Sequence, residues 1–152
     1  MRLNGLIPAA AALTEATDDT LIYCCGPEGL LQAVEEKSAH WPKGSLRLER
    51  FAPKVIVRDG DDQPFEVEFT QSGTVVTVGA EESILDAAKR EGISVISSCE
   101  TGTCGTCETT VVSGDVDHRD SILTADEQEA NRTMMICVSR AQGTCPKLVL
   151  AR

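Results

Sequence analysis

Apolar and polar residues follow a period that changes along the chain, and each period predicts one kind of element. Apolar runs and strict alternation are typical of strands. In residues 65–69, FEVEF, apolar and acidic positions alternate, which suits a strand with one buried face. The same reasoning predicts strands over residues 20–24, 45–51, 54–58, 65–69, 73–78, 108–112, 134–138 and 147–150.

Other segments carry the signals of short helices. The predicted helices cover residues 7–16, 28–37, 84–91 and 125–131. In the second of these, Leu30, Leu31 and Val34 fall on one face. Ser83 and Thr124 directly precede the last two, and both are residue types that cap helix N-termini.

The order of the elements divides the chain in two. Residues 1–53 contain a strand, a helix and a strand, as in an α/β sheet, but they are too few to close such a sheet. Ala52-Pro53 marks the boundary. Residues 54–152 begin with strands, continue with a helix and end with further strands, which predicts an α+β domain of ~100 residues. We therefore expect one domain over 1–53 and another over 54–152.

Charge is distributed unevenly between these two parts. The formal net charge is −10; residues 1–53 carry 5 basic and 7 acidic side chains, and residues 54–152 carry 9 and 17. An acidic surface repels nucleic acid and anionic membranes, so neither is an expected partner. The same acidity either steers a basic protein partner or serves solubility alone.

The location of the protein is predicted from its apolar runs and its cysteines. No apolar run approaches the ~20 residues of a membrane span. The first residues faintly resemble a signal peptide, but Pro8 interrupts the apolar stretch and its alanines are weakly hydrophobic. Seven cysteines, an odd number, argue against a closed disulfide framework. We expect a reducing cytoplasm, where thiols stay free.

Four of the cysteines have a spacing that points to a metal cluster. Cys99, Cys104 and Cys107 form C-x4-C-x2-C, and Cys137 follows after 29 residues. This is the ligand pattern of a plant-type [2Fe–2S] cluster. The loop between them is small and polar, and Gly102 and Gly105 let backbone N–H groups approach the sulfurs. All six residues are predicted to bind the cofactor, the four cysteines as metal ligands; no catalytic side chain is predicted.

Two other functions suit a part of the same motif. Cys104-x2-Cys107 alone is compatible with a zinc knuckle or a redox dithiol. Zinc sites pair one such motif with a second, and the sequence has no second motif. A thioredoxin-like dithiol opens a helix, whereas a predicted strand follows Cys107.

The sequence around the cysteines resembles a known family. The segment SCETGTCGTCETTVVSGDVDHRDSILTADEQ, with ICVSRA and LVL beyond it, is similar to the C-terminal ferredoxin domain of the phthalate dioxygenase reductase family. The earlier LIYCCGPEGLLQAV and LRLERF are similar to the end of that family's NAD-binding domain. The resemblance implies a β-grasp ferredoxin-like domain preceded by a partial α/β, Rossmann-like nucleotide-binding segment. It also places Cys25-Gly26-Pro27 near the nicotinamide and Phe51 at the domain junction.

The family implies further cofactors and a partner. Its members carry FMN and NADH sites and pass electrons to a Rieske-type oxygenase or O-demethylase. This chain shows no flavin-binding segment, and before Cys24 it has only Gly5 and no Gly-rich turn for a pyrophosphate. Neither site is therefore expected to be complete, and a flavoprotein reductase in cis or trans is required. A stand-alone ferredoxin with a vestigial extension and a cluster-based sensor are the alternatives.

Several residues outside the cluster motif have two possible roles each. Cys24 and Cys25 are adjacent in a strand and point to opposite faces. Cys25 is either the nicotinamide-side thiol or idle, and Cys145 is expected to be a spare thiol. His118 either lies in a polar turn or has a functional role, in which it tunes the cluster or shuttles protons. Arg119 is expected to form a local ion pair. The partners expected for it are Asp117 and Asp120. One of Met134 and Met135 is expected in the core and the other near the cluster. The acidic residues of the helix near the end, Asp126, Glu127 and Glu129, are expected to form a solvated face.

Overall fold

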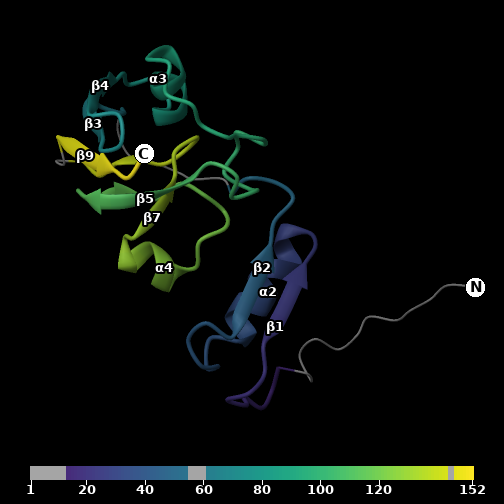
Figure 1. The fold of residues 1–152 in the computed structure, drawn as a ribbon. Helices are drawn as coiled ribbons and strands as arrows, with labels where there is room; N and C mark the ends of the chain where they lie inside the picture. The colour runs from purple at the N-terminus through teal and green to yellow at the C-terminus, as the bar shows by residue number, and fades with distance from the viewer. Residues whose placement is uncertain (1–12, 55–60, 144–145) are drawn as a thin grey trace, which may run out of the picture. The chain divides into compact units, whose positions relative to one another are not determined.

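The computed structural model describes residues 13–54, 61–143 and 146–152 (Figure 1). The chain separates into two compact units, Met1–Phe51 and Ala52–Arg152. This division lies two residues before the boundary expected from the sequence.

The first unit is built around one strand–helix–strand repeat. Strand β1 (Ile22–Cys25) runs parallel to β2 (Leu46–Glu49), and helix α2 (Glu28–Lys37) connects them. Of the three apolar residues expected on one face of α2, Leu31 and Val34 are buried, while Leu30 is 41% exposed. A parallel pair joined by a helix is the βαβ unit of α/β sheets.

A buried arginine joins the end of this repeat to its helix. The Arg50 side chain is 5% exposed, and its guanidinium lies 3.4 Å from the carboxylate of Glu28 and 3.1 Å from that of Glu35. Because these carboxylates lie near the two ends of α2, Arg50 fixes the helix against the chain that leaves β2.

The second unit contains a five-stranded mixed sheet in the order β4-β3-β9-β5-β7. Strands β3 and β9 are parallel, and the other neighbours are antiparallel. The strands are β3 (Phe65–Phe69), β4 (Thr74–Val78), β5 (Glu108–Ser113), β7 (Thr133–Met135) and β9 (Lys147–Leu150). A separate two-stranded pair consists of β6 (Val116–Asp117) and β8 (Arg140–Ala141).

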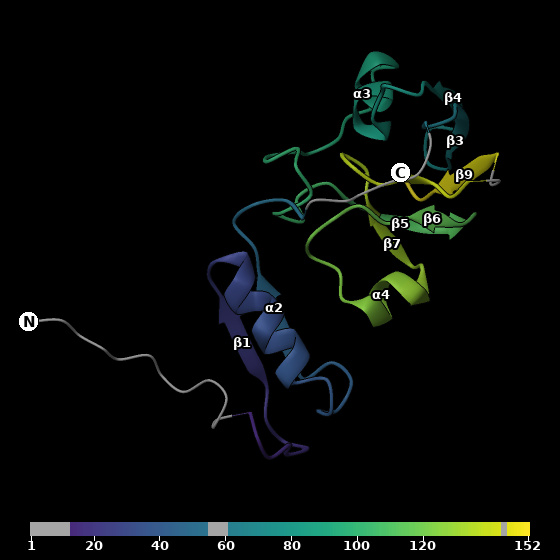
Figure 2. The ribbon, with the colours of Figure 1, turned by 180° about the vertical axis from the view of Figure 1, so that it is seen from behind.

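Helices α3 (Ile84–Arg90) and α4 (Ala125–Ala130) accompany this sheet. In both views α3 lies beside β4 and above β9, β5 and β7, and α4 lies below these strands (Figure 1 and Figure 2). The inward face of α3, including Ile84 and Leu85, packs into the same core as Val67 of β3 and Leu148 of β9. The second unit is therefore an α+β domain with one hydrophobic core.

Both helices begin at the predicted caps. The Ser83 hydroxyl accepts the N–H of Asp86 at 3.0 Å. Thr124 and Glu127 form a capping box at the start of α4, in which each side chain accepts the other residue's N–H. No residue of α4 is buried, so its capping box is its main local support.

Several predicted elements differ from the structure or fall outside its described residues. The expected helix over 7–16 falls mostly outside the described residues, and its last positions, 13–16, form turns; most of the expected strand over 54–58 is also outside them. The predicted strand over 134–138 ends at Met135, because the N–H groups of Val138 and Ser139 turn back to the Met135 carbonyl. The two-residue strands β6 and β8 are too short to produce a periodic signal.

Candidate metal centre

The four clustered cysteines lie on two segments of the second unit. Cys99, Cys104 and Cys107 occupy the loop between α3 and β5, and Cys137 lies in the turn after β7 rather than in the predicted strand. Cys107 and Cys137 are buried, Cys99 is half-buried, and Cys104 is exposed. The centre is therefore enclosed on one side and reaches the surface on the other.

The four cysteine side chains fall into two interacting pairs. Cys99 lies close enough to Cys104, and Cys107 close enough to Cys137, for the contact within each pair to shift a thiol pKa. Among the described ranges, no three His, Cys, Asp or Glu side chains gather around one point as ligands of a single ion. Two thiolates for each of two irons is the protein ligand set of a [2Fe–2S] cluster.

The pairs shift the pKa values of their thiols. Burial acts to raise the pKa of Cys99, but hydrogen bonds from the Thr101 N–H and the Cys104 side chain outweigh it and lower the pKa to about 5. The Cys137 side chain bonds to Cys107 and lowers its pKa to about 7, and the same contact raises the pKa of Cys137. Each pair thus favours at least one thiolate, the form that binds metal.

Backbone N–H groups and hydroxyls surround the sulfurs. The Thr101 N–H lies 3.4 Å from the Cys99 sulfur, and the Gly102 N–H acts to lower the pKa of the Cys137 thiol. The Thr106 hydroxyl lies 3.2 Å from the Cys104 sulfur. Donors of this kind stabilise negative charge on cluster sulfurs and tune the reduction potential.

Gly102 has a conformation and a setting that only glycine fits. Its φ is +72°, and a Cβ placed there would lie 2.7 Å from Cγ2 of Val138 and 3.2 Å from Cα of Asp120. The Gly102 carbonyl also accepts the N–H of Ser121 at 2.9 Å. The cysteine loop therefore rests with its backbone directly against the 120–121 segment and the turn that carries Cys137.

These features fit a [2Fe–2S] cluster. Two thiol pairs supply the ligand number, the N–H groups supply the outer contacts, and Gly105, with φ +75°, turns the loop between Cys104 and Cys107. The residues that sequence reasoning missed are Val138, Asp120 and the loop threonines. The sequence gives little indication of them, because no fixed spacing relates such residues to the cysteine ligands of a cluster.

The DHRD segment departs from expectation in two ways. The His118 side chain is buried rather than part of an open polar turn. Arg119 pairs with Asp117 and Asp62, each at 2.6 Å, and not with Asp120. The reason is that Asp120 is turned inward, where its Oδ2 accepts N–H groups of the following residues. The two methionines before Cys137 are also both buried in the core.

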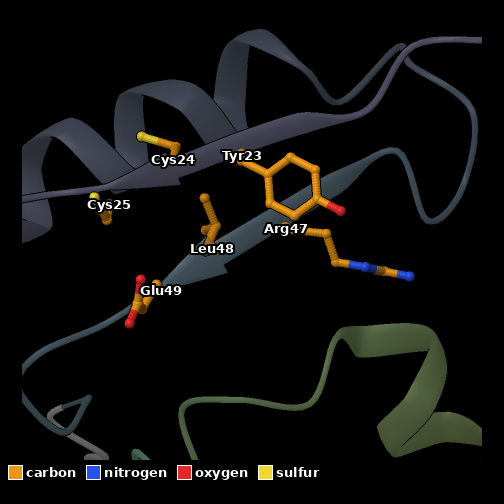
Figure 3. A pocket seen from close by; sticks show the side chains of 6 residues that line it. All are labelled: Tyr23, Cys24, Cys25, Arg47, Leu48 and Glu49. Carbon is orange, nitrogen blue, oxygen red and sulfur yellow. The ribbon is translucent and has the colours of Figure 1, made fainter.

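A second candidate site lies on the first unit. It is a pocket of about 300 Å³ along β1 and β2, and Tyr23 lies beside Arg47 on the neighbouring strand (Figure 3). Cys24 is half-buried and Cys25 exposed, as expected for consecutive strand residues. Cys145 lies outside the described residues. The lining residues are Tyr23, Cys24, Cys25, Arg47, Leu48 and Glu49.

Comparison with known families and proteins gives consistent matches. Residues 67–142, which include all four clustered cysteines, match the family described as 2Fe-2S iron-sulfur cluster binding domain. The phthalate 4,5-dioxygenase oxygenase reductase subunit of Pseudomonas putida is 43% identical over 123 residues, which are 81% of this chain and 37% of that protein. The chain therefore spans well under half the length of this relative.

Two solved structures are also similar. Phthalate dioxygenase reductase, described as a modular structure for electron transfer from pyridine nucleotides to [2Fe–2S], gives a TM-score of 0.66 at 34% identity, over 99% of this chain and 46% of that one. An intact type IV self-sufficient cytochrome P450 monooxygenase gives 0.76 at 40% identity, over 95% of this chain and 19% of that one. None of the helices in the described ranges has the length and apolar character needed to cross a bilayer.

Proposed function

Because this chain belongs to the family of 2Fe-2S iron-sulfur cluster binding domains, we propose that it passes single electrons from a reduced flavin to an oxygenase. When bound, the [2Fe–2S] cluster supplies a centre that gains and loses one electron at a time. We propose Cys99, Cys104, Cys107 and Cys137 as its ligands. The pairing of the four sulfurs is the observation that carries this proposal.

The chain's own residues prepare the site for this role. The Thr101 and Gly102 N–H groups stabilise negative charge on the sulfurs, and Gly102 and Gly105 shape the loop so that these groups can approach. Burial of Cys107 and Cys137 limits water on the inner side. The exposed Cys104 offers the short path to a partner at the surface.

The partner that we propose is a Rieske-type oxygenase. Support comes from relatives such as the phthalate 4,5-dioxygenase oxygenase reductase subunit, whose name ties it to a dioxygenase. The six described cysteines that are free thiols support a reducing cytoplasm as the compartment.

We also propose that residues 1–53 are the end of an NAD-binding domain and 54–152 the ferredoxin domain. The parallel β1–α2–β2 repeat and the match to phthalate dioxygenase reductase over 99% of this chain support this division. In a complete domain the pocket at Tyr23 and Cys25 would lie at the carboxyl ends of parallel strands, where such sheets bind ligands.

Electron delivery can be tested by anaerobic stopped-flow. The purified chain is reduced with dithionite, freed of excess reductant, and mixed with an oxidised Rieske-type phthalate dioxygenase. We expect the visible absorbance of the oxidised chain to return while the oxygenase becomes reduced. The Cys24→Ser variant should behave like the unmodified chain.

The same assay with a cytochrome P450 distinguishes the second candidate partner, which the P450 monooxygenase structure favours. Reoxidation by the P450 and not by the dioxygenase would replace the Rieske partner. A reduced chain that passes electrons to neither would contradict an oxygenase role.

A further inference from the structure

A buried histidine and a buried carboxylate lie together behind the cysteine loop. The His118 side chain is 7% exposed and that of Asp120 is fully buried, with Nδ1 of the imidazole 3.8 Å from Oδ1 of the carboxylate. This separation is an ion-pair distance, too long for a hydrogen bond. Within the described part of the chain, the two ring nitrogens of His118 and the Oδ1 atom of Asp120 have no hydrogen-bond partner.

The carboxylate is held in its charged form. Burial acts to raise the pKa of Asp120, but the nearby His118 side chain and the N–H groups of Leu123 and Ile122 outweigh it and lower the pKa below its ordinary value. Those N–H groups bond to Oδ2 at 2.7 and 3.0 Å, which leaves Oδ1 toward the imidazole. A buried negative charge is therefore compensated fully only when the imidazole is protonated.

The pair is joined to the proposed cluster site through one residue. Gly102 lies so close to Asp120 that a Cβ on the glycine would be 3.2 Å from Cα of the aspartate, which leaves no room for a side chain or water between them. The backbone of Gly102 also lies close enough to Cys137 for its N–H to act on that thiol, lowering its pKa against the other contributions. Charge added at the sulfurs therefore acts on Asp120, and through it on His118, across the packed protein atoms at Gly102, where electrostatic interactions are screened less than in water.

The other charged side chains on the neighbouring segments have partners of their own. These are Arg119 with Asp117 and Asp62, Arg140 with Asp62, Glu100 with Lys89, and Glu127 with Thr124, while Lys54 approaches through its backbone N–H to Ser121. Among ordinary side chains, the imidazole is the one that changes charge near neutral pH.

We propose that His118 takes up a proton when the centre held by the four cysteines is reduced, with Asp120 as the counter-charge. One electron arrives from the flavin donor, and one proton passes from solvent hydronium to an imidazole nitrogen, so that one O–H bond breaks and one N–H bond forms. On reoxidation by the partner the proton returns to water. This inference rests on the proposed cluster site and assigns His118 a positioning and charge-balancing role, not a catalytic one.

The coupling between reduction of the centre and protonation of the imidazole has a defined sign. Negative charge added at the sulfurs raises the proton affinity of a nearby imidazole. By linkage the midpoint potential falls with rising pH over the range in which the reduced protein binds more protons than the oxidised protein, and it is flat outside that range. A tenfold difference in proton affinity corresponds to a total fall of about 59 mV for a one-electron couple.

The test is a potentiometric titration of the cluster-loaded chain, followed by visible absorbance, from about pH 5.5 to about pH 8.5, on either side of the ordinary imidazole pKa. The chain has two histidines, so His40→Gln is a matched control. We expect the midpoint potentials of the unmodified chain and of His40→Gln to fall by about 59 mV over this pH range, the equivalent of a tenfold change in proton affinity. The midpoint potential of His118→Gln should stay constant.

A second variant keeps the test decisive if His118→Gln does not fold. Asp120→Asn retains an acceptor for the two N–H groups and removes the charge, so its potential should be higher at alkaline pH and its pH slope smaller. A constant potential in the unmodified chain, or an unchanged slope in either variant, would overturn the proposal. Because the visible spectrum and iron content are measured first, failure to load a cluster would instead count against the cluster site.

Discussion

Gly102 illustrates how one residue decides the geometry of the centre. With φ at +72° and a Cβ position 2.7 Å from Val138, any side chain would strain the backbone and displace the turn that carries Cys137. Gly73 has a similar φ of +66° but open space around its Cβ position. A comparison of substitutions at these two positions therefore separates the cost of backbone strain from the cost of steric overlap.

We predict that Gly102→Ala destabilises the cluster-loaded chain by about 3 kcal/mol, the sum of a left-handed backbone cost of about 1–2 kcal/mol and an overpacking cost of about 1–3 kcal/mol. Gly73→Ala should cost about 1–2 kcal/mol, from the backbone alone. Urea unfolding of both variants measures the difference. Equal losses in the two variants would show that the contact between Gly102 and Val138 does not constrain the loop.

At this scale the sequence predicted the ligands' spacing but not their surroundings. The C-x4-C-x2-C motif and the distant Cys137 have a fixed chemical meaning, and the match to the cluster-binding family confirms the [2Fe–2S] cofactor. The inward turn of Asp120 could not be predicted, because it depends on N–H groups that become available only after the 120–123 segment has folded.

Among the elements, the segment from 97 to 107 has the least support of its own. It contains turns and bends without helix or strand before β5 begins at Glu108. It is rich in Gly, Ser and Thr and so cannot be ordered by burial of apolar side chains. Metal binding must supply the ordering free energy, as in other small metal-closed domains.

We therefore predict that removing the cluster lowers the thermal midpoint by about 10 °C, the shift that a loss of ~2 kcal/mol produces in a domain of ~100 residues. Hydrogen exchange should become fast in residues 97–107 and stay slow in β3 (Phe65–Phe69), which is paired on both sides. Unchanged melting together with unchanged protection of the loop would contradict this account.

Most elements could be predicted because their signals are local. Helix α2 and strands β3 and β9 have the predicted bounds, since a strict period and clear end signals define them. The fold class and the β-grasp expectation agree with the family and with phthalate dioxygenase reductase. The predicted end of β7 was wrong because apolar Ile136 and Val138 continue the alternation although the backbone already turns at Met135.

For the whole molecule, acidity is concentrated in the residues after 53. Nine basic and 17 acidic side chains lie there, and this excess attracts a basic partner surface. We predict that electron delivery to the oxygenase slows as salt is raised, because a Debye length of about 10 Å at 0.1 M screens steering. Stopped-flow rates across a salt series measure this; a constant rate would assign the acidity to solubility alone.

The 152-residue chain is also expected to need a flavoprotein. Hydride donors release electrons in pairs, whereas a [2Fe–2S] cluster takes one. The sequence before β1 contains a single glycine, Gly5, and so has no Gly-rich motif for a pyrophosphate. We predict reduction of the purified chain by dithionite but not by NADH, until a flavoprotein reductase is added. Anaerobic bleaching of the visible absorbance measures this, and bleaching by NADH in a flavin-free sample would contradict it.

The most direct test of the central claim is to count iron and record paramagnetic resonance spectra of cysteine variants. The unmodified chain, Cys24→Ser and Cys25→Ser should each hold about two irons and give a rhombic signal only after one-electron reduction. Serine at Cys99, Cys104, Cys107 or Cys137 should abolish or severely weaken both. Full iron content and an unchanged signal in one of these four variants, or their loss in Cys24→Ser or Cys25→Ser, would contradict the assignment.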